Sequence, residues 1–270
     1  MKPPLRVLHI TDTHLRATAG ATLLGVDTAA SLDAVLRQAL AEHEPDAVLA
    51  SGDLAHDPEP AAYELFAGLL REHFSGPVLH LPGNHDLSAP FARLFGARDA
   101  IGAGAWEIVG FDSHADYRPE ASFDSAARQA LAERIRSSRA AHILLACHHP
   151  PMPVGCPWLD KDCIPEGLEL LESCAAAGRR PDAADTRVRG LVFGHVHQQV
   201  DERVGGLRVL GSPSTCFQFE PGSSGFAIDR AGERGLPGYR WLILHPDGEL
   251  HTEVRRLSGY SLNLDMSDRS

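Results

Sequence analysis

The chain has 270 residues, of which 43% are hydrophobic and 23% charged, and this composition is typical of a folded domain with a sizeable core. Its net charge of −11 argues against long nucleic acid as a substrate, because proteins that bind polyanions normally present a basic face. A small phosphate ester is compatible with this charge, since metal ions bound at one spot determine the local field.

The sequence indicates a cytoplasmic protein that does not cross a membrane. No apolar run approaches the ~20 residues that span a bilayer. Met1–Ile10 enters a strand-like run directly, without the apolar core and cleavage site of a signal peptide. The five cysteines are odd in number and form no Cys-x-x-Cys pair, as is typical of a reducing compartment.

Five short apolar runs each end at an Asp, Asn or His. Because their apolar residues are continuous rather than alternating, we expect strands that are buried on both faces. The runs are Leu5–Ile10, Ala47–Ala50, Val78–Leu81, Ile143–Ala146 and Leu191–Phe193.

Helical spacing of apolar residues separates these strands. The first helix is predicted to begin at Asp27 or Thr28 and to end before Pro45, and three more are predicted around residues 65–70, 131–135 and 168–174. Strands that alternate with helices predict an α/β fold. In such a fold the chemistry lies beyond the carboxyl ends of the strands, where the polar residues stand.

The last quarter of the chain is richer in strands. The strand-like segments are Arg208–Leu210, Phe226–Ile228, Tyr239–Leu244 and Glu249–Leu257. An Asp-Gly turn at Asp247-Gly248 predicts a hairpin between the last two. We expect a second, more antiparallel sheet that packs on the first, one domain over residues 1–257, and a flexible tail over residues 258–270.

Seven side chains that can bind metal ions follow the five predicted strands: Asp12, His14, Asp53, Asn84, His148, His195 and His197. Carboxylates and imidazoles without thiolates suit Mn, Fe or Zn. Two neighbouring ions need one shared ligand, and Gly52 lets the backbone at Asp53 approach closely. Each motif alone is ordinary, but five polar strand ends buried without partners would be costly, so together they indicate a shared metal site.

The spacing leaves two arrangements open for His195 and His197. Two residues apart on an extended segment, they would face one metal ion together. On a sharply turned loop they would bind one ion each. Asp12 and His14 have the same spacing.

The other histidines are interpreted as structural. His9 and His80 lie inside strands and are expected in the core. Surface or loop positions are expected for His43, His73, His114, His142, His245 and His251. One strand end aims only one of His148 and His149 into the site, and His148 is preferred as the ligand because it stands two residues before Pro150. His56 is left open between a surface and a cleft position.

At these residues the sequence resembles the calcineurin-like metallophosphoesterase superfamily. The order of its motifs is Asp-x-His, Gly-Asp, Gly-Asn-His-Asp or -Glu, a single His, and Gly-His-x-His. All are present without a substitution: Asp12/His14, Gly52/Asp53, Gly83–Asp86, His148 and Gly194–His197. Outside the motifs, residues 148–160, 211–219 and 237–241 are similar to bacterial class III 3′,5′-cyclic-AMP phosphodiesterases of the CpdA type. The likeness extends from Arg6 to about Leu257.

The resemblance implies a four-layer α/β/β/α sandwich with two mixed sheets and two metal ions per chain, with Fe or Mn expected and Zn as the alternative. It assigns Asp12, His14, Asp53 and His197 to one ion, and Asp53, Asn84, His148 and His195 to the other, so that Asp53 bridges. Asn84 and His85 would contact the substrate. His85 would act in catalysis without binding metal, and Asp86 would orient it.

The implied reaction is hydrolysis of 3′,5′-cyclic AMP to 5′-AMP by a hydroxide that bridges the two ions. The alternatives are another cyclic nucleotide, a glycerophosphodiester or a nucleotide pyrophosphate. The implied partner is therefore a small cyclic nucleotide, without long nucleic acid or membrane, and the resemblance is compatible with a homodimer.

Overall fold

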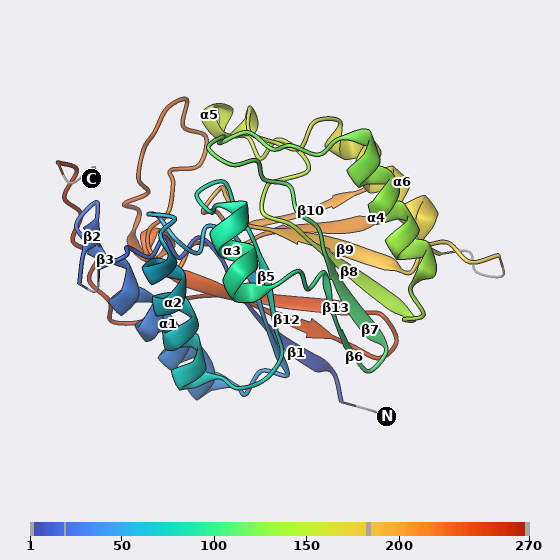
Figure 1. The fold of residues 1–270 in the computed structure, drawn as a ribbon, viewed down its shortest axis with the longest axis horizontal. Helices are drawn as coiled ribbons and strands as arrows, with labels where there is room; N and C mark the ends of the chain where they lie inside the picture. Colours follow the sequence, from blue (N-terminus) through green and yellow to red (C-terminus); the bar gives the residue numbers. More distant parts are fainter. Residues whose placement is uncertain (1–2, 19, 182–184, 268–270) are drawn as a thin grey trace.

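A computed structural model describes residues 3–18, 20–181 and 185–267. Residues 268–270 of the predicted tail lie outside the described residues, whereas the predicted first run, Leu5–Ile10, lies within them. Two large sheets form the centre of the molecule (Figure 1).

The first sheet is mixed and has the strand order β13-β12-β1-β4-β5. Strand β4 runs parallel to both β1 and β5, whereas β12 runs antiparallel to both β1 and β13. The strands are β1 (Leu5–Ile10), β4 (Ala47–Ser51), β5 (Val78–Leu81), β12 (Gly238–Leu244) and β13 (Leu250–Arg256).

The second sheet is also mixed and has the order β10-β11-β9-β8-β7-β6. Its four central strands are parallel, and each edge strand is antiparallel to its neighbour. The strands are β6 (Ala100–Ala103), β7 (Trp106–Gly110), β8 (His142–Ala146), β9 (Val188–Phe193), β10 (Val200–Val204) and β11 (Leu207–Gly211). A separate small hairpin consists of β2 (Thr22–Leu23) and β3 (Val26–Asp27).

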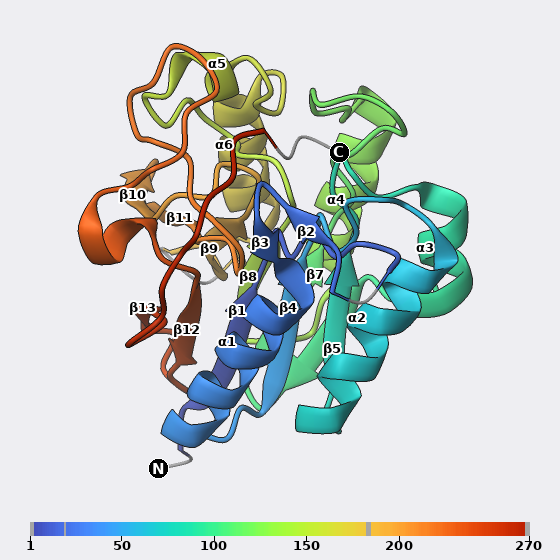
Figure 2. The same cartoon turned by 90° about the vertical axis from the view of Figure 1, so that its left-hand side faces the viewer.

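Helices cover the outer face of each sheet, as Figures 1 and 2 show. The first sheet is covered by α1 (Thr28–Glu42), α2 (Pro60–His73) and α3 (Ser88–Phe95). The second is covered by α4 (Ser125–Ser137) and α6 (Gly167–Ala177). The short helices α5 (Pro157–Asp160) and η1 (Gly232–Gly235) lie in loops. The predicted four-layer α/β/β/α sandwich with two mixed sheets is confirmed.

Strand β1 shows why the predicted runs are apolar throughout. Leu8 and Ile10 pack under the helices, whereas Val7 packs between the two sheets, and all three are fully buried. The predicted start of the first helix is also confirmed, because the Asp27 carboxylate accepts a hydrogen bond of 2.9 Å from the N–H of Ala30.

The prediction for the last quarter is wrong in two respects. Its strands do not form a sheet of their own, because β11 joins the second sheet while β12 and β13 extend the first. Phe226–Ile228 is not a strand, and only an isolated bridge joins Ile228 to Phe219. The predicted hairpin at Asp247-Gly248 is confirmed.

Most of the structural histidines lie where the sequence predicts. His9 is fully buried, and Ser51 and Ser212 bind its two ring nitrogens. The prediction of a surface or loop position is wrong for His142, which lies in β8 and is only 8% exposed, whereas His114 lies in a loop as predicted but is also only 8% exposed. His114 is enclosed by carboxylates, and the ring of His142 packs 5.1 Å from Trp106.

The described part of the tail lies on the small hairpin. Leu262, Leu264 and Met266 pack against a cluster that includes Leu24, and the N–H of Asp265 donates to the carbonyl of Leu24 at 2.8 Å. The domain boundary at 257 and the flexibility of the tail stay predictions. In the part of the chain that the structure describes, no helix has the length and apolar character needed to cross a membrane.

Candidate metal centre

All seven predicted ligands lie in loops that follow strands. Asp12 and His14 follow β1, and Asp53 and Asn84 follow β4 and β5 of the same sheet. His148 follows β8 of the second sheet, and His195 and His197 follow β9. Contacts between these side chains join the two sheets at their loop edge.

Five of the seven residues have a left-handed backbone, which residues other than glycine rarely adopt. The φ angles are 53° at Asp12, 45° at His14, 51° at Asp53, 63° at His195 and 49° at His197. Such backbone strain persists only where the surrounding structure enforces it, and it gathers at functional sites.

Two motif glycines bring the loops together. A Cβ atom at Gly83 would lie 2.2 Å from Oδ1 of Asp53, and one at Gly194 would lie 2.7 Å from Oδ2 of Asp12. No side chain can be added at either position without displacing the carboxylate.

One half of the site gathers around Asp12. Its Oδ1 lies 3.3 Å from Nε2 of His197, whose Nε2 lies in turn 3.2 Å from Nε2 of His14. The backbone N–H of His195 donates to both carboxylate oxygens, at 3.1 and 3.0 Å. Burial opposes ionisation of Asp12, but His197 outweighs it and lowers the pKa of the carboxyl.

The other half gathers around the amide oxygen of Asn84. This oxygen lies 3.1 Å from Nε2 of His148 and 2.8 Å from Nδ1 of His195. Burial lowers the pKa of His195, although its contact with Asp162 opposes the shift. His195 is therefore neutral at pH 7 and has a nitrogen lone pair to offer.

Asp53 joins the two halves. Its Oδ2 lies 3.7 Å from Nε2 of His14 and 3.4 Å from Nε2 of His148, and its Oδ1 accepts the backbone N–H of His85 at 2.8 Å. Burial opposes ionisation, but His148 and His85 hold the pKa of Asp53 well below its usual range. For His148, burial is outweighed by Asp53, which raises the pKa of the imidazole to about 9.

Backbone carbonyls orient two of the imidazoles. Nδ1 of His148 donates to the carbonyl of Ser51 at 2.9 Å, and Nδ1 of His197 donates to the carbonyl of Phe217 at 2.8 Å. Each ring therefore presents Nε2 to the cluster. This fixed orientation by a partner on the other nitrogen is typical of histidines that bind metal ions.

The donor set fits two cations. Side-chain donors of Asp12, His14 and His197 lie within 4.8 Å of one another, as do those of Asp12, Asp53 and His148. Imidazole nitrogens and carboxylate oxygens without thiolates suit Mn, Fe and Zn. The facing Nε2 atoms of His14 and His197 leave lone pairs that a cation would satisfy.

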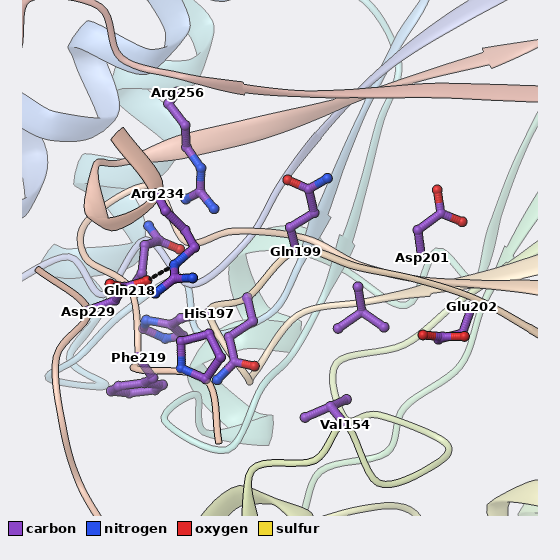
Figure 3. Close-up of a pocket in the computed structure, with 13 residues that line it drawn as sticks. Val154, His197, Gln199, Asp201, Glu202, Gln218, Phe219, Asp229, Arg234 and Arg256 are labelled. Atoms are coloured by element: carbon purple, nitrogen blue, oxygen red, sulfur yellow. Dashed lines mark hydrogen bonds and ion pairs between the residues drawn. The ribbon is translucent and has the colours of Figure 1, made fainter. Parts of the chain in front are cut away.

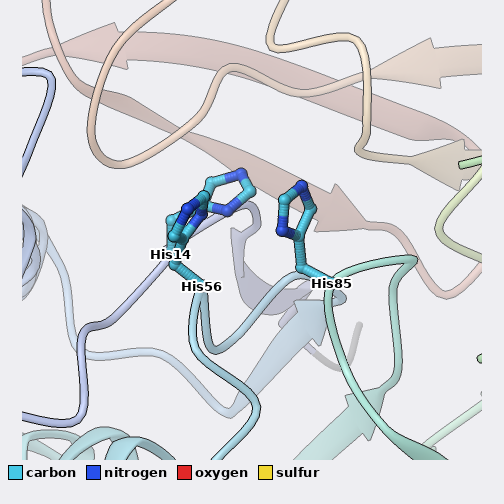
Figure 4. Close-up of side chains that lie close together, drawn as sticks. All are labelled: His14, His56 and His85. Atoms are coloured by element: carbon cyan, nitrogen blue, oxygen red, sulfur yellow. The ribbon is translucent and has the colours of Figure 1, made fainter. Parts of the chain in front are cut away.

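His85 and His56 stand beside the cluster with His14 (Figure 4). The ring of His85 lies 4.8 Å from that of His14 and stacks on that of His56 at 4.9 Å. Burial and the neighbouring His85 lower the pKa of His56 to about 4. The open question about His56 is thus resolved in favour of the cleft.

Asp86 binds backbone rather than an imidazole. Its carboxylate accepts N–H groups of Leu54 and Ala55 at 3.1 Å each and of Gly83 at 2.9 Å. It therefore ties the loop after β4 to the loop after β5. Burial and the charge of Asp53 raise the pKa of Asp86 to about 7, a shift that cations next to Asp53 would oppose.

His149 is buried beside His148 but uses both ring nitrogens elsewhere. Nδ1 lies 2.9 Å from the hydroxyl of Ser113, and Nε2 donates to the carbonyl of Pro119 at 3.1 Å. The preference for His148 over His149 agrees with this geometry.

The sequence did not suggest Asp162. This carboxylate is only 3% exposed, its Oδ2 lies 3.6 Å from Nε2 of His195, and its Oδ1 has no hydrogen-bond partner. It follows α5 in the loop before α6. Only its position next to a segment that resembles the phosphodiesterases could have drawn attention to it.

Two cavities border the centre. The first, of about 410 Å³, is here called the phenylalanine pocket, and it is lined by His14, Leu23, Leu24, His56, His85, Phe217, Phe219 and Phe226. The second, of about 440 Å³, is here called the acidic cavity (Figure 3), and its lining includes Asp201, Glu202 and Asp229. His197 also lines the acidic cavity, and Phe219 lines both.

The chain is similar to known proteins in both sequence and fold. The model of the calcineurin-like phosphoesterase family matches residues 5–199. The chain is 37% identical over 261 residues to the 3′,5′-cyclic adenosine monophosphate phosphodiesterase CpdA of Escherichia coli K12, covering 94% of this chain and 90% of the relative. It is 35% identical over 265 residues to CpdA of Pseudomonas aeruginosa, covering 96% and 92%.

A further relative is a 3′,5′-cyclic-nucleotide phosphodiesterase of Nostoc. The two sequences are 31% identical over 271 residues, which cover 98% of this chain and 96% of the relative. Among solved structures, purple acid phosphatase from yellow lupin superposes with a TM-score of 0.65 at 12% identity, covering all of this chain and 55% of the phosphatase. At this identity the likeness concerns the fold alone.

Proposed function

Because the chain belongs to the calcineurin-like phosphoesterase family, we propose that it hydrolyses 3′,5′-cyclic AMP to 5′-AMP at a dinuclear metal centre. The observation that carries the proposal is the convergence of the predicted ligands on Asp53, which faces His14 from one half of the site and His148 from the other. The substrate follows from relatives that align over nearly the whole chain.

The donor sets divide between two ions that share Asp53. Asp12, His14 and His197 would complete one set, and Asn84, His148 and His195 the other. His195 and His197 thus serve different ions, the arrangement expected of a turned loop. Two ions held by these residues would supply Lewis acidity, which would activate water for attack and neutralise phosphoryl charge.

His85 is the proposed catalytic residue, because it borders the cluster yet leaves its ring out of both donor sets. Its N–H bond to Asp53 fixes its backbone, and its half-buried ring opens to the phenylalanine pocket. From there the imidazole binds a phosphoryl oxygen together with Asn84 and delivers a proton to the departing 3′ oxygen. Asp86 acts as a positioning residue that holds the His85 loop through Gly83.

A substrate panel with metal-defined enzyme tests the proposal. Enzyme loaded with Mn or Fe should convert 3′,5′-cyclic AMP to 5′-AMP, which chromatography separates from 3′-AMP. Cleavage of other phosphodiesters with cyclic AMP left intact would overturn the substrate and leave the phosphoesterase standing. A cytoplasmic location and a homodimer stay predictions.

The same assay with His85→Ala tests the roles of the residues. We expect both metal ions to remain and kcat to fall about 10²- to 10³-fold, the scale of losing one transition-state donor or acid. His251→Ala, which removes an exposed histidine of β13, is the control and should match the wild type. Loss of metal from His85→Ala, with activity restored by excess metal, would make His85 a ligand instead.

A further inference from the structure

The phenylalanine pocket opens directly onto the proposed reaction centre. His14 and His85 line it, and both border the metal cluster. Its volume of about 410 Å³ lies within the range of sites for small organic ligands. A group covalently joined to the reacting phosphate would therefore enter this pocket.

Three phenylalanines in mutual contact, here called the wall, line the pocket together with His56 and His85. Phe219 lies 5.9 Å from Phe217 and 5.7 Å from Phe226, between ring centroids. The ring of Trp158 packs behind the wall, 5.0 Å from Phe219 and 5.8 Å from Phe226. Phe226 is nevertheless 49% exposed, so a large aromatic face remains available at the rim.

The wall is held in place by buried contacts. Gln218, between two of the phenylalanines, is 1% exposed and donates to the carbonyls of Ser214 and Leu236 at 2.9 and 3.1 Å. Leu23 and Leu24 complete the wall from the small hairpin, to which Asp265 of the tail is bonded. A pocket formed in advance loses little freedom when a ligand binds.

We propose that the phenylalanine pocket binds the purine base of the cyclic nucleotide, by stacking and apolar contact with Phe226 and its neighbours. This inference rests on the proposed function. Aromatic side chains bind bases through their faces, and no carboxylate or amide side chain is among the described residues that line the pocket.

The acidic cavity is less suited to the base. Its lining meets the metal cluster only at His197, and both ring nitrogens of that residue face other groups: the carbonyl of Phe217, and Asp12 with His14. Charged groups of both signs line it, the carboxylates of Asp201, Glu202 and Asp229 and the guanidinium groups of Arg234 and Arg256, whereas a neutral purine base gains more from the faces of the phenylalanines in the other pocket.

The test is a cycle of two changes: Phe226→Ala in the protein and removal of the base from the substrate. The probes are 3′,5′-cyclic AMP and a base-free ribose 3′,5′-cyclic phosphate. Phe226→Ala should raise KM for cyclic AMP about 5- to 100-fold, the effect of losing one stacking ring. It should leave kcat/KM for the base-free diester within about twofold, because that diester lacks the group that Phe226 would contact. A contact between Phe226 and the base would therefore make the effects of the two changes non-additive.

Two control variants isolate the pocket. Leu168→Ala removes an exposed apolar side chain on α6, and Glu202→Gln alters the acidic cavity. Both should keep the wild-type KM for cyclic AMP. Phe226→Leu should recover part of the loss, since it restores apolar area without the ring.

The outcomes separate the two proposals. Equal effects of Phe226→Ala on both diesters, or no effect on either, would overturn the base pocket while hydrolysis of cyclic AMP still stands. A rise in KM with Glu202→Gln alone would assign the base to the acidic cavity. Wild-type enzyme that cleaves the base-free diester but not cyclic AMP would overturn the proposed function and the pocket with it.

Discussion

Replacement of Asp162 should weaken one metal ion and spare the other. Its carboxylate lies 3.6 Å from Nε2 of His195, and it favours the tautomer with a proton on Nε2. That tautomer leaves the lone pair on Nδ1, the atom that lies 2.8 Å from the amide oxygen of Asn84. Without the carboxylate the proton can move to Nδ1 and block the position of the metal ion.

Removal of such a partner typically lowers metal affinity about 10- to 100-fold, or about 1.4 to 2.8 kcal/mol. The Asp162–His195 distance of 3.6 Å exceeds that of a short charge-assisted bond, so we expect the lower end, about tenfold, for Asp162→Ala. Asp162→Asn keeps an acceptor oxygen without the charge and should lose less.

Metal titration of the metal-free protein, with competition by a chelator, measures the two dissociation constants separately. Only the site that contains His195 should weaken, because Asp162 lies against His195 and that residue belongs to one donor set alone. Asp160→Asn is the matched control, since that neighbouring carboxylate accepts the N–H of Val154 at 2.7 Å. Wild-type affinity at both sites in Asp162→Ala would refute the reasoning.

Two other predictions concern metal content and pH. Asp53→Ala should lose both ions and activity, which elemental analysis and hydrolysis assays check; a single tightly held ion in fully active wild type would refute the dinuclear centre. Burial opposes protonation of His114, but the hydrogen bond that its imidazole donates to Asp112 raises its pKa above 6.5. The stabilisation is complete below pH 6.5 and is lost as pH rises through the folded-state pKa. The free energy of unfolding, measured in denaturant from pH 6 to 9, should thus fall more steeply for wild type than for His114→Gln. The difference between the two falls should stay below about 1 kcal/mol, because the carboxylates are solvated. Parallel curves for the two proteins would contradict this.

The positions of the strands and of their carboxyl ends are the part of the fold that the sequence predicts best. Continuous apolar runs such as Leu5–Ile10 report local burial on both faces, and the polar residue that ends each run marks the sheet edge. Which strands pair with one another depends on residues far apart in the chain, so a local pattern cannot predict it. Nothing in Tyr239–Leu244 indicates that it pairs antiparallel with β1 rather than joining β11 in a separate sheet.

The candidate site likewise has a part that local sequence motifs predict and a part that only the fold brings together. Its seven predicted ligands stand in motifs of one to four residues, so their pattern is visible in the sequence. The phenylalanine pocket is assembled from the hairpin at Leu23, the loop at Phe217 and the segment at Phe226, which are far apart in the chain. Asp162 likewise acquires meaning only from its distance to His195.

Backbone strain at the site yields a last prediction. His14 has φ 45°, a conformation that typically costs a residue with a side chain about 1 kcal/mol and costs glycine almost nothing. In the metal-free protein, His14→Gly and His14→Ala lose the same imidazole contacts and differ mainly in this strain. Glycine should therefore be the more stable replacement, by up to about 1 kcal/mol, although its greater unfolded-state entropy offsets part of the gain.

At Leu36, in the middle of α1 and away from any left-handed backbone, the order should reverse, with the alanine variant more stable than the glycine variant by about 1 kcal/mol. Equilibrium unfolding in denaturant measures both pairs. If the alanine variant is more stable than the glycine variant by the same margin at both positions, the left-handed backbone at His14 is not strained. The metal ions would then have no backbone strain to offset in this loop.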